Sequence, residues 1–84
     1  MARAYVKISV AAGKERDVRD KLRARPEVTS ADLTSGDQDI IALVESDSFD
    51  ELLDLTLNQL RTIEGVTGTV TNLVIDKEEG PGAK

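Results

Sequence analysis

Hydrophobic and polar residues alternate strictly near the start of the chain. Within residues 4–10, every second residue is apolar and polar residues stand between them: Ala4, Val6, Ile8 and Val10 against Tyr5, Lys7 and Ser9. A period of two places the two sets on opposite faces of a β-strand. The pattern therefore predicts a first strand over residues 4–10, with a short connection at residues 11–13.

Two later segments favour helices. Residues 14–25 are rich in good helix formers, and Pro26 ends that helix because it cannot continue the hydrogen-bond ladder. A stronger helix begins at Ser48, three residues before Glu51, which is the spacing of a capping box. Its apolar residues recur at three- and four-residue steps and predict one continuous face: Phe49, Leu52, Leu53, Leu57, Leu60 and Ile63. Gly65 is the expected terminator.

Three further strands complete the pattern. Residues 28–34 are rich in β-branched side chains, and residues 39–45 hold five consecutive apolar residues, typical of a central strand covered on both faces. The turn-forming residues 35–38 join these two strands into an antiparallel hairpin. Residues 66–75 predict a fourth strand. We therefore expect one domain over residues 4–76 and a flexible tail over residues 77–84, which holds two Gly and a Pro.

The element order β-α-β-β-α-β predicts a ferredoxin-like α+β fold, with a four-stranded antiparallel sheet and two helices on one face. The other face carries Tyr5, Lys7 and Ser9 from the first strand. From the last strand it carries one of two pairs, a choice that stays open: Leu73 and Ile75, or Val70 and Val74. An uncovered sheet with apolar residues predicts a partner sheet, and hence a dimer that is face to face or edge to edge.

The amino-acid composition excludes several classes of catalytic and metal-binding site. The 84 residues contain no Cys and no His, which removes thiol nucleophiles, disulfides, the usual zinc sites and the best proton shuttle near neutral pH. We expect no enzyme activity, no catalytic residues, no metal and no cofactor. The net charge of −5 has the wrong sign for direct nucleic-acid binding. No segment approaches the ~20 apolar residues of a membrane span, and the expected location is the cytoplasm.

Charge is unevenly distributed along the chain. Residues 14–25 carry six basic and three acidic residues, whereas residues 26–60 carry nine acidic residues and no basic one. Opposed patches on a small domain can steer copies of it into a defined assembly. They are equally typical of an ordinary solvated surface, and the sequence leaves both interpretations open.

The segment 34–39, which reads Thr-Ser-Gly-Asp-Gln-Asp, is the main candidate for ligand chemistry. Its Gly allows a sharp turn that exposes backbone amides, which can bind a carboxylate. Its carboxylates and hydroxyls are acceptors for an ammonium group, so that both ends of an amino acid could be bound. The alternative is an ordinary hairpin turn, in which Asp and Gly are simply good turn formers.

The chain from Tyr5 to Ile75 resembles the ligand-binding and oligomerising domain of the Lrp/AsnC (feast/famine) regulators. The resemblance rests on the order and spacing of several short segments. These are the opening strand leading to Gly13, the Pro-Glu-Val at 26–28, the hairpin at 35–44, the helix start at 47–52, and residues 63–66 followed by 69–71.

The resemblance implies a sheet-to-sheet dimer that assembles further, often into rings of eight subunits, with amino-acid effectors between subunits. It places Gly36, Asp37 and Asp39 at the effector site, with Thr34 and Ser35 beside them. The sequence departs from the family pattern at Gln38, where an aromatic residue is usual. Because the first strand begins within four residues of Met1, we also expect a stand-alone form without the family's helix-turn-helix domain.

Two functions stay open at this point. In the first, the protein senses a small molecule, an amino acid above all, and acts in transcriptional regulation by assembling with itself or with full-length regulators. In the second, it is a purely structural oligomerisation domain whose effector site is vestigial. A thermal response to an amino acid would separate the two.

Overall fold

A computed structural model describes residues 1–36 and 39–75 of the chain. Its four strands form one antiparallel sheet in the order β2-β3-β1-β4. The strands are β1 (Ala2–Val10), β2 (Val28–Leu33), β3 (Ile40–Ser46) and β4 (Val66–Leu73). This is the ferredoxin-like sheet that the sequence predicts, and the expected domain end and tail at residues 76–84 lie outside the described residues.

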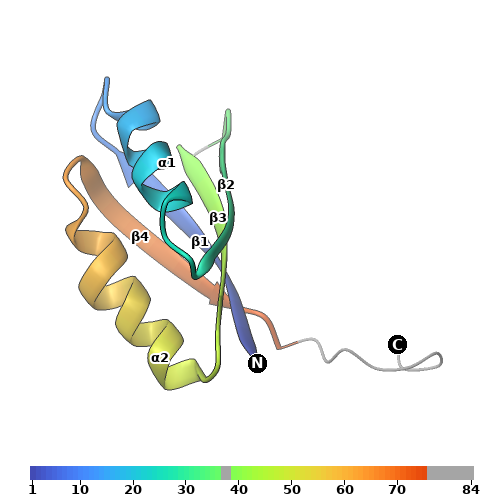
Figure 1. The fold of residues 1–84 in the computed structure, drawn as a ribbon. Coiled ribbons are helices and arrows are strands. Elements are labelled where there is room, and N and C mark those ends of the chain that lie inside the picture. The colour runs from blue at the N-terminus through green and yellow to red at the C-terminus, as the bar shows by residue number, and fades with distance from the viewer. Residues whose placement is uncertain (37–38, 76–84) are drawn as a thin grey trace.

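Two helical segments cover one side of this sheet (Figure 1). The first is α1 (Glu15–Arg23), which ends before Pro26 as predicted. The second begins as α2 (Phe49–Asp54), continues as a π-helical turn, η1 (Leu55–Gln59), and ends as a 3-10 turn, η2 (Leu60–Thr62). No helix within the described part of the chain is both long enough and apolar enough to span a membrane.

The core lies between the sheet and the helices and is built from aliphatic side chains. Its largest fully buried apolar members are Val6, Ile8, Val18, Leu22, Ile40, Val44, Leu52 and Leu60. Tyr5 and Phe49, the two aromatic residues of the chain, are both exposed. Packing density and aliphatic burial therefore stabilise this fold without any aromatic ring in the core.

The buried face of the second helix differs from the predicted one. Leu52 and Leu60 are buried as expected, and Ile63 packs against the core from a half-buried position. Leu55 and Thr56 are also buried, however, whereas three predicted members of the face are exposed: Phe49, Leu53 and Leu57. The buried residues recur at three- and four-residue steps, so they form an ordinary helical stripe that lies to one side of the predicted one. The polar residue Thr56 belongs to this stripe, which is why the apolar pattern alone does not reveal it.

The start of this helix has one of the two hydrogen bonds of the predicted capping box. The Ser48 hydroxyl oxygen accepts a 3.2 Å hydrogen bond from the backbone N–H of Glu51. In a full capping box, the Glu51 carboxylate would return to the Ser48 backbone. Instead, Glu51 Oε1 accepts a 2.9 Å hydrogen bond from Ser46 Oγ, which ties the helix start to the end of β3.

Gly65 lies in the turn between the second helix and β4, where the sequence predicts a terminator. Its φ of +102° is a conformation that favours glycine. A Cβ atom there would lie 3.0 Å from Lys14 Cβ and 3.0 Å from Val18 Cγ2. The backbone N–H of Ala11 donates a 2.8 Å hydrogen bond to the Gly65 carbonyl, so this turn packs closely against the start of α1.

Strand pairing decides which β4 residues lie on the open face of the sheet. Val70 pairs with Lys7, and Ile41 pairs with Lys7 from the other side, which gives one row of side chains on the face away from the helices. A second row joins Leu43, Tyr5 and Asn72. Leu73 pairs with the buried Ala4 and so points to the helix side. Of the two pairs that the sequence left open, the one containing Val70 lies on the open face.

Candidate functional site

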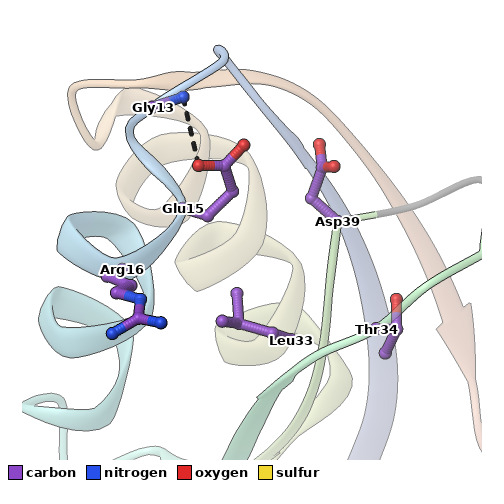
Figure 2. Close-up of a pocket in the computed structure, with 6 residues that line it drawn as sticks. All are labelled: Gly13, Glu15, Arg16, Leu33, Thr34 and Asp39. Carbon is purple, nitrogen blue, oxygen red and sulfur yellow. Dashed lines mark hydrogen bonds between the residues drawn. The ribbon is translucent and has the colours of Figure 1, made fainter.

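An open hollow of about 480 Å³ lies where the β1–α1 connection meets the β2–β3 hairpin (Figure 2). The two segments meet because β1 and β3 are antiparallel, with Ile8 opposite Ile40, so the end of β1 lies beside the start of β3. The residues that line the hollow come from both segments: Gly13, Glu15, Arg16, Leu33, Thr34 and Asp39.

Asp39 is held in place by three hydrogen bonds. Its backbone N–H donates to the Ile8 carbonyl over 3.1 Å, and its own carbonyl accepts from the Thr34 N–H over 2.9 Å. Its side-chain Oδ2 accepts a 2.7 Å hydrogen bond from the backbone N–H of Val10. The carboxylate is therefore fixed at the wall of the hollow, with one oxygen already bound to the end of β1.

The opposite wall is the start of α1. Gly13 has a φ of +88°, which turns the chain sharply after β1. The Gly13 N–H donates a 3.1 Å hydrogen bond to Glu15 Oε1 across this turn. Figure 2 shows the Glu15 and Asp39 carboxylates at one end of the hollow and the Arg16 guanidinium farther down α1.

The hollow combines two negative groups, one positive group and one apolar side chain. A zwitterion such as an amino acid needs carboxylates for its ammonium group and a cation for its carboxylate, and Arg offers the planar donor geometry that suits carboxylates. Leu33 adds an apolar contact for a side chain. Within residues 1–36 and 39–75, no group of three or more Asp or Glu side chains is placed to hold a metal ion.

The sequence-based site is only partly reproduced by this hollow. Thr34 and Asp39 line it, whereas Ser35 and Gly36 are exposed residues of the hairpin that do not. Asp37 lies outside the described residues.

Glu15 and Arg16 were missed because they are about twenty positions away from the hairpin in sequence. The signal was present: antiparallel pairing of the first and third strands brings the residues that follow Gly13 to the hairpin.

Comparison with known families and proteins shows which family the chain is similar to. Residues 3–80 match the family model described as Lrp/AsnC ligand binding domain. The HTH-type transcriptional regulator FL11 of Pyrococcus furiosus is 36% identical over 72 residues, which are 86% of this chain and 47% of that protein. The chain thus spans about half the length of the curated relatives it matches.

Solved structures show the same fold. The crystal structure of FFRP-DM1 is 36% identical, with a TM-score of 0.86 over 89% of this chain and 100% of that one. The NMB0573/L-Met complex of Neisseria meningitidis, described as a transcriptional regulator, has a TM-score of 0.80 over 99% of this chain and 55% of that one. At 19% identity, the second likeness is one of fold alone.

Proposed function

Because the chain belongs to the Lrp/AsnC ligand binding domain family, we propose that it senses an amino acid and assembles with further copies as a module of transcriptional regulation. Residues 4–76 form this module, and its role is binding rather than catalysis. The observation that carries the proposal is the hollow between α1 and the β2–β3 hairpin, which offers both carboxylates and a guanidinium.

The proposed ligand position follows from the charges. The ammonium group lies between Glu15 and Asp39, and the ligand carboxylate faces Arg16. The hairpin residues Ser35, Gly36 and Asp37 stand next to this position in sequence and complete the site together with Thr34. The Neisseria meningitidis regulator with the same fold was crystallised with L-Met, which supports an amino acid as the class of ligand.

The assembly proposal rests on the open face of the sheet. On this face, Tyr5 of β1 is 47% exposed and Val70 of β4 is 55% exposed. The half-buried Ile41 and Leu43 lie on the neighbouring strand β3. Apolar side chains gathered on one face of a sheet are stabilised when a second sheet covers them. We propose a sheet-to-sheet dimer as the basic unit, which assembles further, up to the octamer that the family resemblance implies.

Full-length regulators of the same family are the proposed partners in the cell. The curated relatives carry this module within a chain of about twice its length and are named HTH-type transcriptional regulators. The module shifts their oligomeric balance when its ligand binds, by favouring one assembly over another. The module acts in the cytoplasm, without nucleic-acid contact of its own.

A thermal-shift screen over the twenty amino acids tests the ligand proposal. An amino acid present at 100 times its dissociation constant should stabilise the protein by about 2.7 kcal/mol. Arg16→Gln, Glu15→Gln and Asp37→Ala should each abolish the response. Asp17→Asn is the matched control, because Asp17 is an exposed α1 carboxylate next to Arg16 that does not line the hollow.

A second function stays open: a purely structural oligomerisation domain with a vestigial effector site. Its support is that one oxygen of Asp39 is already bound to Val10 and that the chain has Gln38 where the family pattern has an aromatic residue. If no amino acid changes the melting temperature at millimolar concentration while the dimer persists, this structural function replaces the sensing one.

A further inference from the structure

The outer surface of the second helix carries apolar side chains that the core does not use. Phe49, Leu53 and Leu57 follow each other at four-residue steps and are 48%, 39% and 51% exposed. By contrast, α1 has no large hydrophobic side chain among the exposed residues of the described chain. Three half-exposed apolar residues in one ridge are typical of a surface that a partner covers.

An acidic hollow of about 400 Å³ is lined in part by Asp50 and Asp54, the residues that directly follow Phe49 and Leu53 in the second helix. Four carboxylates contribute to its lining: Glu27, Asp50, Glu51 and Asp54. The ion pairs formed within residues 1–36 and 39–75 are Arg19–Asp20 and Arg23–Asp32, so none of the four carboxylates forms an ion pair there. A guanidinium of the same chain reaches the lining only through an amide: Arg25 Nη1 donates a 2.6 Å hydrogen bond to Gln59 Oε1. Like charges gathered in this way repel each other and favour the approach of a cation.

One carboxylate oxygen of the lining residues lacks a hydrogen-bond donor. Glu27 Oε1 is buried and has no hydrogen-bond partner among the described residues. A buried acceptor without a donor is costly, because it has given up water without gaining a hydrogen bond. The exposed carboxylates of Asp50 and Asp54, rather than this buried oxygen, are the groups that a basic side chain of another molecule can reach.

The same chain carries the complementary charge on α1. Lys14 and Lys21 are exposed, and neither forms an ion pair in the part of the chain that the structure describes. They belong to the segment 14–25, which has three more basic than acidic residues. A lysine can lay its aliphatic stem along an apolar ridge while its ammonium group reaches a carboxylate, which fits a ridge beside an acidic hollow.

We propose that the outer surface of the second helix, made of the Phe49–Leu53–Leu57 ridge and the acidic hollow, docks the basic α1 segment of a second copy of this chain. The contact is head to tail: the acidic side of one copy meets the basic side of the next. Such contacts close into rings or extend as filaments. This inference rests on the proposed sheet-to-sheet dimer, because it supplies the contact that joins dimers into larger assemblies.

The contact is weak when it acts alone. Three half-exposed side chains fall well short of the ~800 Å² per partner that a stable interface buries. Two such contacts between a pair of dimers act together, however, and raise the apparent affinity without any new interaction. Because the charges involved are exposed to solvent, salt should dissociate the larger assembly into dimers.

Charge reversal on the two surfaces tests the proposal by light scattering at low salt. We expect wild-type protein to have a mass well above twice the 9.1 kDa chain. Asp50→Lys/Asp54→Lys and Lys14→Glu/Lys21→Glu should each weaken assembly by about tenfold or more in concentration and leave dimers. An equimolar mixture of the two variants should regain the larger mass, because each restores the charge match for the other. Glu64→Lys, which reverses an exposed carboxylate outside the hollow, should assemble as wild type does.

The outcomes separate this proposal from the dimer on which it rests. A wild-type protein that stays dimeric at low salt would overturn the docking proposal alone. So would normal assembly of the lysine variant, which would show that something other than α1 covers the ridge. If the aspartate variant does not fold, Leu53→Ser/Leu57→Ser provides the same test, and normal assembly of that variant would overturn the proposal. A monomeric wild type would instead contradict the sheet-to-sheet dimer.

Discussion

Asp39 and Val10 are 29 positions apart in sequence, and the Asp39 carboxylate accepts a 2.7 Å hydrogen bond from the Val10 backbone N–H. This bond connects the start of β3 to the end of β1, and Asp39 itself lines the candidate ligand hollow. Asp39 therefore serves the fold and the proposed site at once, and the two roles can be separated by substitution.

We expect Asp39→Ala to destabilise the protein by about 1–3 kcal/mol, because the substitution leaves the Val10 N–H without its acceptor. Asp39→Asn should cost less, since an amide oxygen can still accept that bond. Urea denaturation measures both. Asn at this position should nevertheless weaken any amino-acid response, because it removes the charge. An Asp39→Ala variant as stable as wild type would show that the Val10 bond contributes nothing.

Gly65→Ala should be the most damaging glycine substitution among the described residues. The new Cβ meets a φ of +102° and two side-chain atoms at 3.0 Å, so conformational and steric costs add. Gly13 has a φ of +88°, but a Cβ atom added there would have no other atom within 4 Å. Gly13→Ala should therefore cost only the ~1 kcal/mol of the left-handed conformation. Thermal unfolding compares the two, and an equal loss in both would argue against close packing at Gly65.

Ser48→Ala should cost about 1 kcal/mol, because the Glu51 backbone N–H loses the hydroxyl that accepts its hydrogen bond. Asp47→Ala is the neighbouring control and should change the free energy of unfolding by less than about 0.5 kcal/mol. Chemical denaturation monitored by circular dichroism measures both. A Ser48→Ala variant as stable as wild type would show that Glu51 and Ser46 alone hold the helix start.

Val70→Asp and Leu57→Asp form a matched pair for the two proposed surfaces. The wild-type side chains are similarly exposed, at 55% and 51%, but Val70 lies on the open sheet face and Leu57 on the second helix. Charge on the sheet face should give monomers, because a buried unpaired carboxylate opposes sheet-to-sheet packing. Charge on the helix should leave dimers and prevent larger assemblies. Sedimentation velocity distinguishes the two, and a dimeric Val70→Asp variant would place the dimer contact elsewhere.

The element order and the sheet topology could be predicted from the sequence, because period-two alternation and turn residues act locally. The face of the second helix could not. The apolar pattern assigns Leu53 and Leu57 to the core, but the stripe that is buried continues from Leu52 through Leu55 and Thr56. Thr56 has a polar side chain, and it is satisfied in the core only because Oγ1 donates a 3.0 Å hydrogen bond to the Leu52 carbonyl.

The candidate site shows the same division between local and long-range information. Thr34 and Asp39 belong to a hairpin that turn chemistry reveals, and both line the hollow. Glu15 and Arg16 come from another part of the chain, and only strand pairing brings them to that hairpin. Charge patterns alone do not encode such proximity, which is why two of the three charged lining residues could not be predicted from the sequence.

Tyr5 is the only tyrosine of the chain, the chain has no tryptophan, and the phenol stands half-exposed in the middle of the open sheet face. The protein thus carries an intrinsic optical probe at the proposed dimer contact. Ultraviolet fluorescence of the unlabelled protein, followed through a dilution series, would report the phenol's passage from a partner's surface into water. No dye or engineered reporter would be needed to follow association.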